Sequence, residues 1–366
     1  MFINCIVGNR HACSVRQMKK IFLLALVIRL ISLYLFRNVT NYDLQSYLQI
    51  GELTLKGINI YPDAANLHHP YLPFFLYLEA LAYSLGRSEI IIITIIKIIN
   101  IIFDLAIVQL VYLLSKKSLK TAFLYAINPV TILITTLHGQ FDVIPIFFIL
   151  LAIYLLNRKQ ELLFVLSFSF AIMTKTWPLL FILILYKRLK NKKFIILSLV
   201  FPLISIIIYS LLFKTSIFNI VKTIVYYQGL WGIWGLWGLL GRLGVFWQKL
   251  TTLIFITYFF SYSYFKNKKN LIREILNLLF FFFVFTTNFS IQYFSWLMPF
   301  LILIKPKKSL QLIILITLYL FSSYYFWLFC VGCKITSPWL VVTQNITGFI
   351  LWLSFIKAGY LSREIS

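Results

Sequence analysis

Acidic side chains are scarce in this sequence: only 10 of its 366 residues are Asp or Glu, and all charged residues together make up 12%. Hydrophobic residues make up 61%, and the mean hydropathy is +0.90. So few polar groups cannot cover the surface of a soluble globular domain, which excludes that class. We expect an all-α, polytopic transmembrane helix bundle, because helices satisfy their own backbone hydrogen bonds in lipid.

Cysteine is also scarce, and its spacing gives little support to a metal site. Cys330 and Cys333 have the spacing of a zinc knuckle, but no second Cys or His pair accompanies them. We therefore predict no metal at these residues and interpret them as ordinary thiols at a helix end. A small disulfide outside the cytoplasm is the alternative.

Basic residues are abundant, with 34 Lys and Arg giving a net charge of +24. Such an excess is typical of nucleic-acid-binding proteins, but here the basic residues stand in short clusters between apolar runs. Clusters of this kind set membrane topology and attract anionic lipid headgroups. The sequence therefore predicts the lipid bilayer as a partner and excludes nucleic acid.

The apolar runs between Ile21 and Ile356 predict about twelve membrane segments in a single domain, residues 1–366. Two of the runs, 162–174 and 178–186, are short enough to be a broken or hairpin pair. With this topology the basic clusters share one face, which the positive-inside rule assigns to the cytoplasm together with the N-terminus. These clusters are the N-terminal region, 116–120, 158–159, 187–193, 266–273, 305–308 and the C-terminal tail.

Two loops are then expected on the external, periplasmic or luminal face. The first, residues 37–87, holds four of the ten acidic residues: Asp43, Glu52, Asp63 and Glu79. Its pattern over 45–55 predicts an amphipathic helix lying in the membrane interface. The second, residues 214–244, contains a Trp/Gly-rich run over 231–238 that indicates an interfacial anchor or an aromatic surface for a sugar or polyprenyl chain. An active site on this face favours lipid-linked donors over soluble nucleotide sugars.

Several short motifs follow one another along this external face. Asp43 is followed by Tyr47, one helical turn later and on the same helix face. The motifs that come after are Gly57-Ile58-Asn59-Ile60-Tyr61-Pro62, His69-Pro70-Tyr71-Leu72-Pro73, Asn128-Pro129 with His138-Gly139-Gln140-Phe141-Asp142, and Asn288-Phe289-Ser290-Ile291-Gln292-Tyr293-Phe294-Ser295-Trp296-Leu297-Met298-Pro299. In this order, over roughly residues 20–300, the chain resembles the GT-C glycosyltransferases, multispanning enzymes that use polyprenyl-phosphate sugars. Ile291 stands where that family usually has proline.

The resemblance implies that Asp43 is the catalytic base. Without the resemblance, the simpler interpretation of Asp43 is an aspartate in a solvated loop. The family's paired acidic motif is replaced by Asp43-Leu44, so a divalent metal is doubtful, and the polyprenyl-phosphate sugar is the expected ligand. A role for Asp142 in substrate binding competes with a role at the positive end of the helix dipole. The resemblance also implies donor or acceptor contacts for Tyr47, Tyr61, His69, His138, Gln140, Gln292 and Tyr293.

Charged residues inside apolar segments form a separate group. Lys175 lies between two half-segments with no acid close in sequence, so we predict that it meets the donor phosphate in a water-filled cavity, with snorkelling to an interface as the alternative. Arg242 is the rival phosphate ligand. Arg29 and Asp104 are expected about 13 Å and about 18 Å above the cytoplasmic boundary. We interpret them as a structural ion pair that Lys97 joins, unless Lys97 faces the donor.

Together these features predict transfer of a hexose, with mannose as the first candidate, from a polyprenyl-phosphate donor to a glycan, lipid or protein acceptor. The alternatives are a secondary transporter or lipid-linked sugar flippase, and a non-catalytic scaffold of a glycan-assembly complex. Transporters usually have two related halves with broken helices at the midplane. The informative polar residues here lie on one face, which favours the enzyme.

Overall fold

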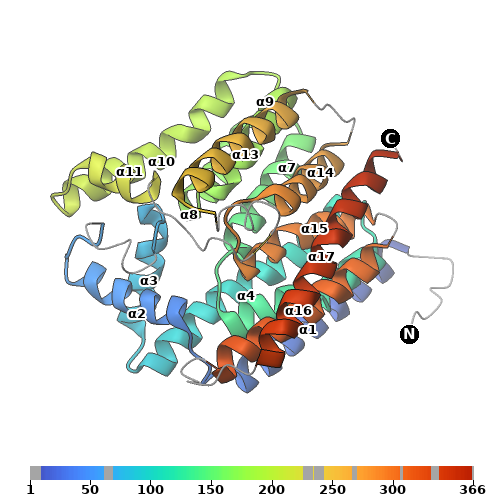
Figure 1. Cartoon of the computed structure of the whole chain (residues 1–366), viewed down its shortest axis with the longest axis horizontal. Helices are drawn as coiled ribbons and strands as arrows, with labels where there is room; N and C mark the ends of the chain where they lie inside the picture. The colour runs from blue at the N-terminus through green and yellow to red at the C-terminus, as the bar shows by residue number, and fades with distance from the viewer. Residues whose placement is uncertain are drawn as a thin grey trace.

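The structure is a computed structural model that describes residues 10–61, 69–225, 234, 243–265, 270–305, 308–330 and 338–364 (Figure 1). Within these ranges the chain is helical and has no strand, which confirms the all-α class. The helices are α1 (Arg10–Leu35), α2 (Tyr42–Leu55), α3 (Pro73–Leu85), α4 (Glu89–Leu114), α5 (Leu119–Ala126), α6 (Pro129–Ile132), the π-helix η1 (Leu133–His138), α7 (Val143–Asn157), α8 (Glu161–Thr174), the 3₁₀ helix η2 (Trp177–Phe181), α9 (Ile182–Arg188), α10 (Lys193–Leu212), α11 (Ile217–Val225), α13 (Val245–Phe265), α14 (Leu271–Phe285), the 3₁₀ helix η3 (Ile291–Tyr293), α15 (Phe294–Ile304), α16 (Ser309–Cys330) and α17 (Pro338–Glu364).

The described parts of the first loop form two packed helices, α2 and α3. Asn41 starts α2 by accepting a hydrogen bond from the backbone N–H of Leu44 at 3.0 Å, as N-cap residues do. Pro73 begins α3, where its missing N–H is of no consequence. The helices approach so closely that a Cβ added to Gly51 would lie 2.7 Å from the carbonyl oxygen of Glu79. The helix expected over 45–55 is therefore present.

The helix ends that carry the basic clusters lie together at one end of the bundle, which we call the basic end. The Ser14 and Tyr112 hydroxyls, 2.7 Å apart, join the start of α1 to the end of α4. Lys187 Nζ donates to Glu274 Oε1 at 2.9 Å and joins α9 to the start of α14. Figure 1 shows α2 and α3 on the opposite side of the molecule from the start of α1 and the end of α17. We call that side the loop end.

Two described helices, α4 and α10, are long and apolar enough to cross a membrane. A third crossing results if α5 and the segment 129–138 count as one span, bent by 41° where Asn128 and Pro129 begin a new helix. The structure thus does not support about twelve membrane segments. Several apolar runs form helices too short for a hydrocarbon core of about 30 Å. For example, the 15 residues of α7 extend only about 22 Å.

The outward face of α10 is strongly apolar. Its side chains Ile196, Leu203 and Leu211 are 65%, 56% and 74% exposed. An exposed apolar surface of this kind is typical of a membrane or protein contact. The break expected near residue 175 is also present, because α8 ends at Thr174 and η2 begins at Trp177.

Candidate functional site at the loop end

Asp43 lies in the first turn of α2, and a neighbouring turn of the chain holds its carboxylate. The Asn41 side chain donates to the His138 carbonyl at 2.8 Å, which fixes the start of α2 against the end of η1. From the same turn, His138 Nε2 lies 3.3 Å from Asp43 Oδ2, and Gln140 Nε2 donates to that oxygen. The Tyr47 hydroxyl donates to Gln140 Oε1 at 3.0 Å, which orients the amide.

The hydrogen bonds leave one carboxylate oxygen available. Both bonds to Asp43 reach Oδ2, and within the described residues none reaches Oδ1. The Asp43 side chain is 33% exposed. His138 Nδ1 lies 3.2 Å from the Tyr324 hydroxyl. The imidazole is thus held between the Tyr324 hydroxyl and the Asp43 carboxylate. Oδ1 therefore remains without a hydrogen-bond partner among the described residues.

The charge of Asp43 is stabilised by its neighbours. Burial raises the pKa of its carboxyl, but the hydrogen bond and charge of His138, the charge of Lys175 and the hydrogen bond from Gln140 together outweigh burial. The pKa therefore lies below its ordinary value of 3.8. Asp43 is ionised at neutral pH, and the stability it contributes is lost only as pH falls through this lowered value.

Gly139 makes the turn possible. It has a left-handed backbone with φ of 78°, and its carbonyl accepts from Asn100 Nδ2 at 3.0 Å. An added Cβ would lie 2.7 Å from Leu44 Cδ2. Glycine at this position thus lets His138 and Gln140 approach Asp43 from one short turn.

We expect Gly139→Ala to lower the free energy of unfolding by at least about 1–2 kcal/mol, because a side chain disfavours the left-handed conformation. It should also reduce activity, because the clash with Leu44 moves the turn off Asp43. Gly57→Ala is the matched control, since Gly57 has φ of 69° and an added Cβ there meets nothing within 4 Å. Thermal unfolding in detergent and an activity assay check both variants. Both variants incur the cost of the left-handed backbone, so the contact with Leu44 is tested by the difference between them. A loss of stability and activity no larger in Gly139→Ala than in Gly57→Ala would contradict this role for Gly139.

A second polar cluster begins at the next residues of the same turn. Lys175 Nζ donates to Asp142 Oδ2 at 2.7 Å, and Trp296 Nε1 donates to Asp142 Oδ1 at 2.7 Å. Lys175 Nζ also lies 4.5 Å from the centre of the Phe141 ring and 5.1 Å from that of Tyr71. These contacts correct one expectation, because Lys175 is paired with Asp142 and is not an uncompensated cation. Asp142 stands at the N-cap position of α7, as a partner of the helix dipole would, although its side chain makes no cap hydrogen bond.

His69 is buried rather than open to a substrate, which corrects the expected contact. Its side chain is 0% exposed, and its Nε2 lies 2.9 Å and 3.0 Å from the two carboxylate oxygens of Glu79. Burial lowers the pKa of His69 to about 3 and raises that of Glu79 well above its ordinary value of 4.5. A neutral histidine facing a protonated carboxyl is therefore the stable form, and the pair holds one proton.

This pair predicts a stability maximum between about pH 4.5 and about pH 6.5, where the unfolded pair also holds one proton. Above that window the unfolded pair holds no proton, and below it the unfolded pair holds two protons, whereas the folded pair holds one. The free energy of unfolding therefore falls on both sides of the window, by up to about 1.4 kcal/mol per pH unit. Glu79→Gln should remove the alkaline loss and leave stability rising with pH from about 3 to about 6.5. Thermal unfolding against pH measures this. A wild-type-minus-variant difference that stays flat above pH 6.5 would contradict it.

The other expected contact residues have different surroundings. Tyr61 is 1% exposed and donates to the Tyr71 carbonyl at 2.9 Å, so it supports the chain and does not face a substrate. The Gln292 side chain accepts from the Ser290 hydroxyl. Tyr293 stacks on Trp296 with ring centres 4.2 Å apart, which joins η3 to the Asp142 cluster. Arg242 lies outside the described residues.

Arg29 and Asp104 form a buried ion pair. Arg29 Nη2 lies 2.7 Å from Asp104 Oδ2, both side chains are 0% exposed, and the Tyr125 hydroxyl donates to Asp104 Oδ1 at 2.7 Å. Lys97 does not join this pair. Its Nζ donates to the carbonyls of Phe36 and Val39 at 3.0 Å and 3.2 Å, and it thereby holds the end of α1.

No protein-family model matches this chain, and no curated protein is significantly similar to it. The function must therefore be argued from the site itself. Among the described residues, no three His, Cys, Asp or Glu side chains form a group that could hold a metal ion.

Three aromatic residues belong to the site although no role was predicted for them. Tyr324 comes from α16, where no motif is recognisable, and contacts His138. Trp296 lies inside the motif at 288–299, which is the signal that could have identified it. Trp177 stacks on Trp296 with ring centres 4.1 Å apart and covers the Asp142 cluster. No spacing in the sequence connects Tyr324 or Trp177 to the other residues of the site.

Proposed function

We propose that this protein is an integral-membrane glycosyltransferase that moves a hexose from a polyprenyl-phosphate donor to an acceptor outside the cytoplasm. The observation that carries the proposal is the state of Asp43. Its carboxylate is ionised, is held at Oδ2 by His138 and Gln140, and has Oδ1 available on a partly exposed side chain. A general base needs an oriented acceptor atom within reach of the proton that it removes.

The proposed step is a single displacement. The acceptor hydroxyl gives its proton to Asp43 Oδ1, and its oxygen forms a bond to the anomeric carbon of the hexose. The bond between that carbon and the phosphate oxygen breaks, and polyprenyl phosphate leaves with the electron pair. Configuration at the anomeric carbon is inverted. The developing negative charge on the leaving phosphate requires a cation or hydrogen-bond donors nearby.

We assign the cation that stabilises the leaving phosphate differently from the expectation based on the sequence, which was Lys175. Lys175 neutralises Asp142 in a buried pair, so its charge already has a protein partner. We propose that Lys175 positions the turn that carries Gln140, and that Arg242 of the second loop is the phosphate ligand. The same proposal places the basic end in the cytoplasm and α4 and α10 in the bilayer, as the positive-inside rule directs.

Transfer in proteoliposomes tests the function. Purified protein is supplied with a polyprenyl-phosphate hexose, with mannose and glucose donors in separate reactions, and with lipid, glycan and peptide acceptors. A labelled product with an inverted glycosidic bond supports the proposal. Counterflow of the lipid-linked sugar with no new glycosidic bond would overturn it in favour of a flippase. Absence of donor binding would leave a scaffold role instead.

A further inference from the structure

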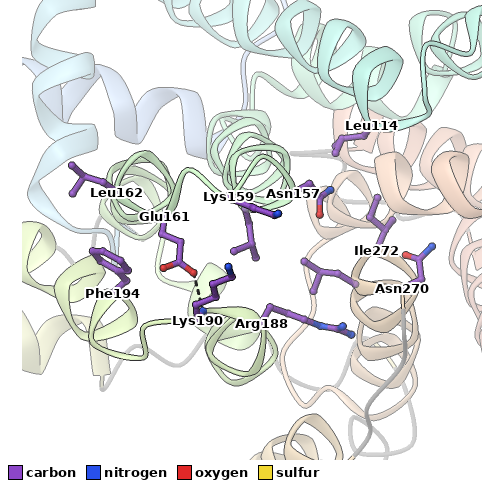
Figure 2. Close-up of a pocket in the computed structure, with 12 residues that line it drawn as sticks. Leu114, Asn157, Lys159, Glu161, Leu162, Arg188, Lys190, Phe194, Asn270 and Ile272 are labelled. Carbon is purple, nitrogen blue, oxygen red and sulfur yellow. Dashed lines mark hydrogen bonds between the residues drawn. The ribbon is translucent and has the colours of Figure 1, made fainter.

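A large open pocket lies at the basic end, where several helix ends meet. Its volume is about 930 Å³. It is formed where α4 and α7 end, where α8 begins, between α9 and α10, and at the start of α14 (Figure 2). It is therefore at the opposite end of the bundle from Asp43, and nothing in the proposed transfer reaction uses it. The lining residues are Leu114, Leu156, Asn157, Lys159, Glu161, Leu162, Arg188, Lys190, Phe194, Asn270, Leu271 and Ile272.

The polar part of the lining is cationic. Figure 2 shows Lys159, Lys190 and Arg188 around the pocket, with Glu161 beside Lys190. Glu161 Oε1 accepts from the Lys190 backbone N–H at 2.8 Å, so that carboxylate fixes the loop after α9. Arg188 Nη2 is engaged by Glu274 Oε2 at 2.8 Å. Within the described residues, Lys159 and Lys190 have no ion pair through their ammonium groups, and both are exposed.

The charges do not cancel. Glu274 is shared by Lys187 and Arg188, and Glu161 is the other acidic residue here. The four cations, adding Lys159 and Lys190, therefore exceed the two carboxylates by two positive charges. An anion with one or two negative charges would restore balance. A phosphate group fits this requirement, because lysine and arginine donors bind its oxygens by charge-assisted hydrogen bonds.

The rest of the lining is apolar and continues onto the outer surface. Leu162 in the pocket is 60% exposed, and its neighbour Leu163 is 47% exposed. Phe194 begins the apolar face of α10, on which Ile196 is 65% exposed. A free inorganic anion would make no favourable contact with these apolar side chains, and the volume of the pocket is many times that of one anion. A lipid has both parts, with a charged headgroup at the boundary and chains along apolar helices.

We propose that this pocket binds an anionic lipid through its headgroup phosphate, with Lys159 and Lys190 as the phosphate ligands. The acyl or isoprenoid chains of the lipid lie along the exposed apolar faces of α8 and α10. Basic pockets between membrane helices on the cytoplasmic side are suited to anionic headgroups. The lipid is thereby bound at the end of the bundle opposite the reaction site.

Native mass spectrometry and fluorescent-lipid titration with phosphatidic acid in phosphatidylcholine nanodiscs test the site. We expect wild-type protein to retain phosphatidic acid and not to enrich phosphatidylcholine. The double variant Lys159→Gln/Lys190→Gln should bind phosphatidic acid about tenfold to about thirtyfold more weakly, as removal of two lysine–phosphate contacts predicts. The matched control is Lys116→Gln/Lys117→Gln, a lysine pair at the same end that does not line the pocket.

Three outcomes would overturn the proposal. The first is no enrichment of phosphatidic acid by the wild type. The second is equal weakening in the two double variants, which would indicate surface charge in general. The third is full displacement of phosphatidic acid by millimolar inorganic phosphate, which would identify a free-phosphate site. Unchanged thermal unfolding of both variants in detergent keeps a loss of binding separate from a loss of fold.

Discussion

Asp43→Asn is expected to reduce hexose transfer by roughly 10²–10⁴-fold, the contribution typical of a general base. The substitution preserves the shape of the side chain and an acceptor oxygen for His138 or Gln140. It removes the group that takes the proton at Oδ1. The fold should therefore survive, and the loss should fall on kcat rather than on donor binding. Transfer in proteoliposomes at saturating donor measures kcat, and thermal unfolding checks the fold.

Glu52→Gln is the control for this experiment. Glu52 is on the same helix, and its carboxylate pairs with Lys56 at the surface, where the two side chains are 40% and 59% exposed. Such a pair contributes little to stability, so this variant should keep both fold and activity. Full transfer by Asp43→Asn would show that the base assignment is wrong. An equal loss in the two variants would show that charge on α2, and not the Asp43 site, governs the rate.

The lowered pKa of Asp43 affects the rate in two ways. It keeps the carboxylate ionised, so the base is available over the whole neutral range. It also makes the carboxylate a weaker proton acceptor, because general-base efficiency follows basicity. Such a weak base is suited to a step in which the bond to the phosphate is largely broken before the proton moves. His138→Ala removes a hydrogen bond and a charge that lower the pKa of Asp43, so this pKa should rise in the variant.

Single segments of the fold could be predicted from the sequence, but the packing between them could not. Composition alone indicates an all-α chain, and the pattern over 45–55 locates α2. The number of membrane spans could not be inferred, because hydropathy registers apolar character and not helix length. Asn128-Pro129 divides an apolar run into α5 and α6, yet the two pieces together remain apolar enough to count as one span.

The motifs of the candidate site could be found in the sequence, but the contacts between them could not. His138 and Gln140 were expected to contact the donor or acceptor, and their hydrogen bonds to Asp43, 95 and 97 residues away, were not predicted. His138 and Gln140 contact Asp43 because one motif, with its glycine, forms a single turn. His69 belongs to an equally plausible motif but faces Glu79, ten residues later, inside the protein. The sequence does not show which face of α3 is buried. That face depends on how α3 is rotated about its own axis, and packing against the whole core sets this rotation.

A large stability effect is expected at the buried pair of Asp142 and Lys175. Lys175→Met leaves Asp142, which is 0% exposed, with Trp296 as its remaining hydrogen-bond donor. Removing one member of a buried ion pair typically costs about 3–5 kcal/mol, because the other charge stays buried without compensation. We expect this variant to unfold at a much lower temperature in detergent, or to accumulate poorly.

The double variant Asp142→Asn/Lys175→Met separates a structural role for Lys175 from a role at the donor phosphate. With neither charge present, the penalty of an unpaired charge disappears, so the double variant should be more stable than Lys175→Met. The amide oxygen that replaces the Asp142 carboxylate can still accept from Trp296. If Lys175 acts only through the fold, transfer should recover together with stability. If stability returns while transfer remains absent, the fold no longer accounts for the loss, and the charges of this pair contribute to the reaction either at the donor phosphate or through the pKa of Asp43, which Lys175 helps to lower.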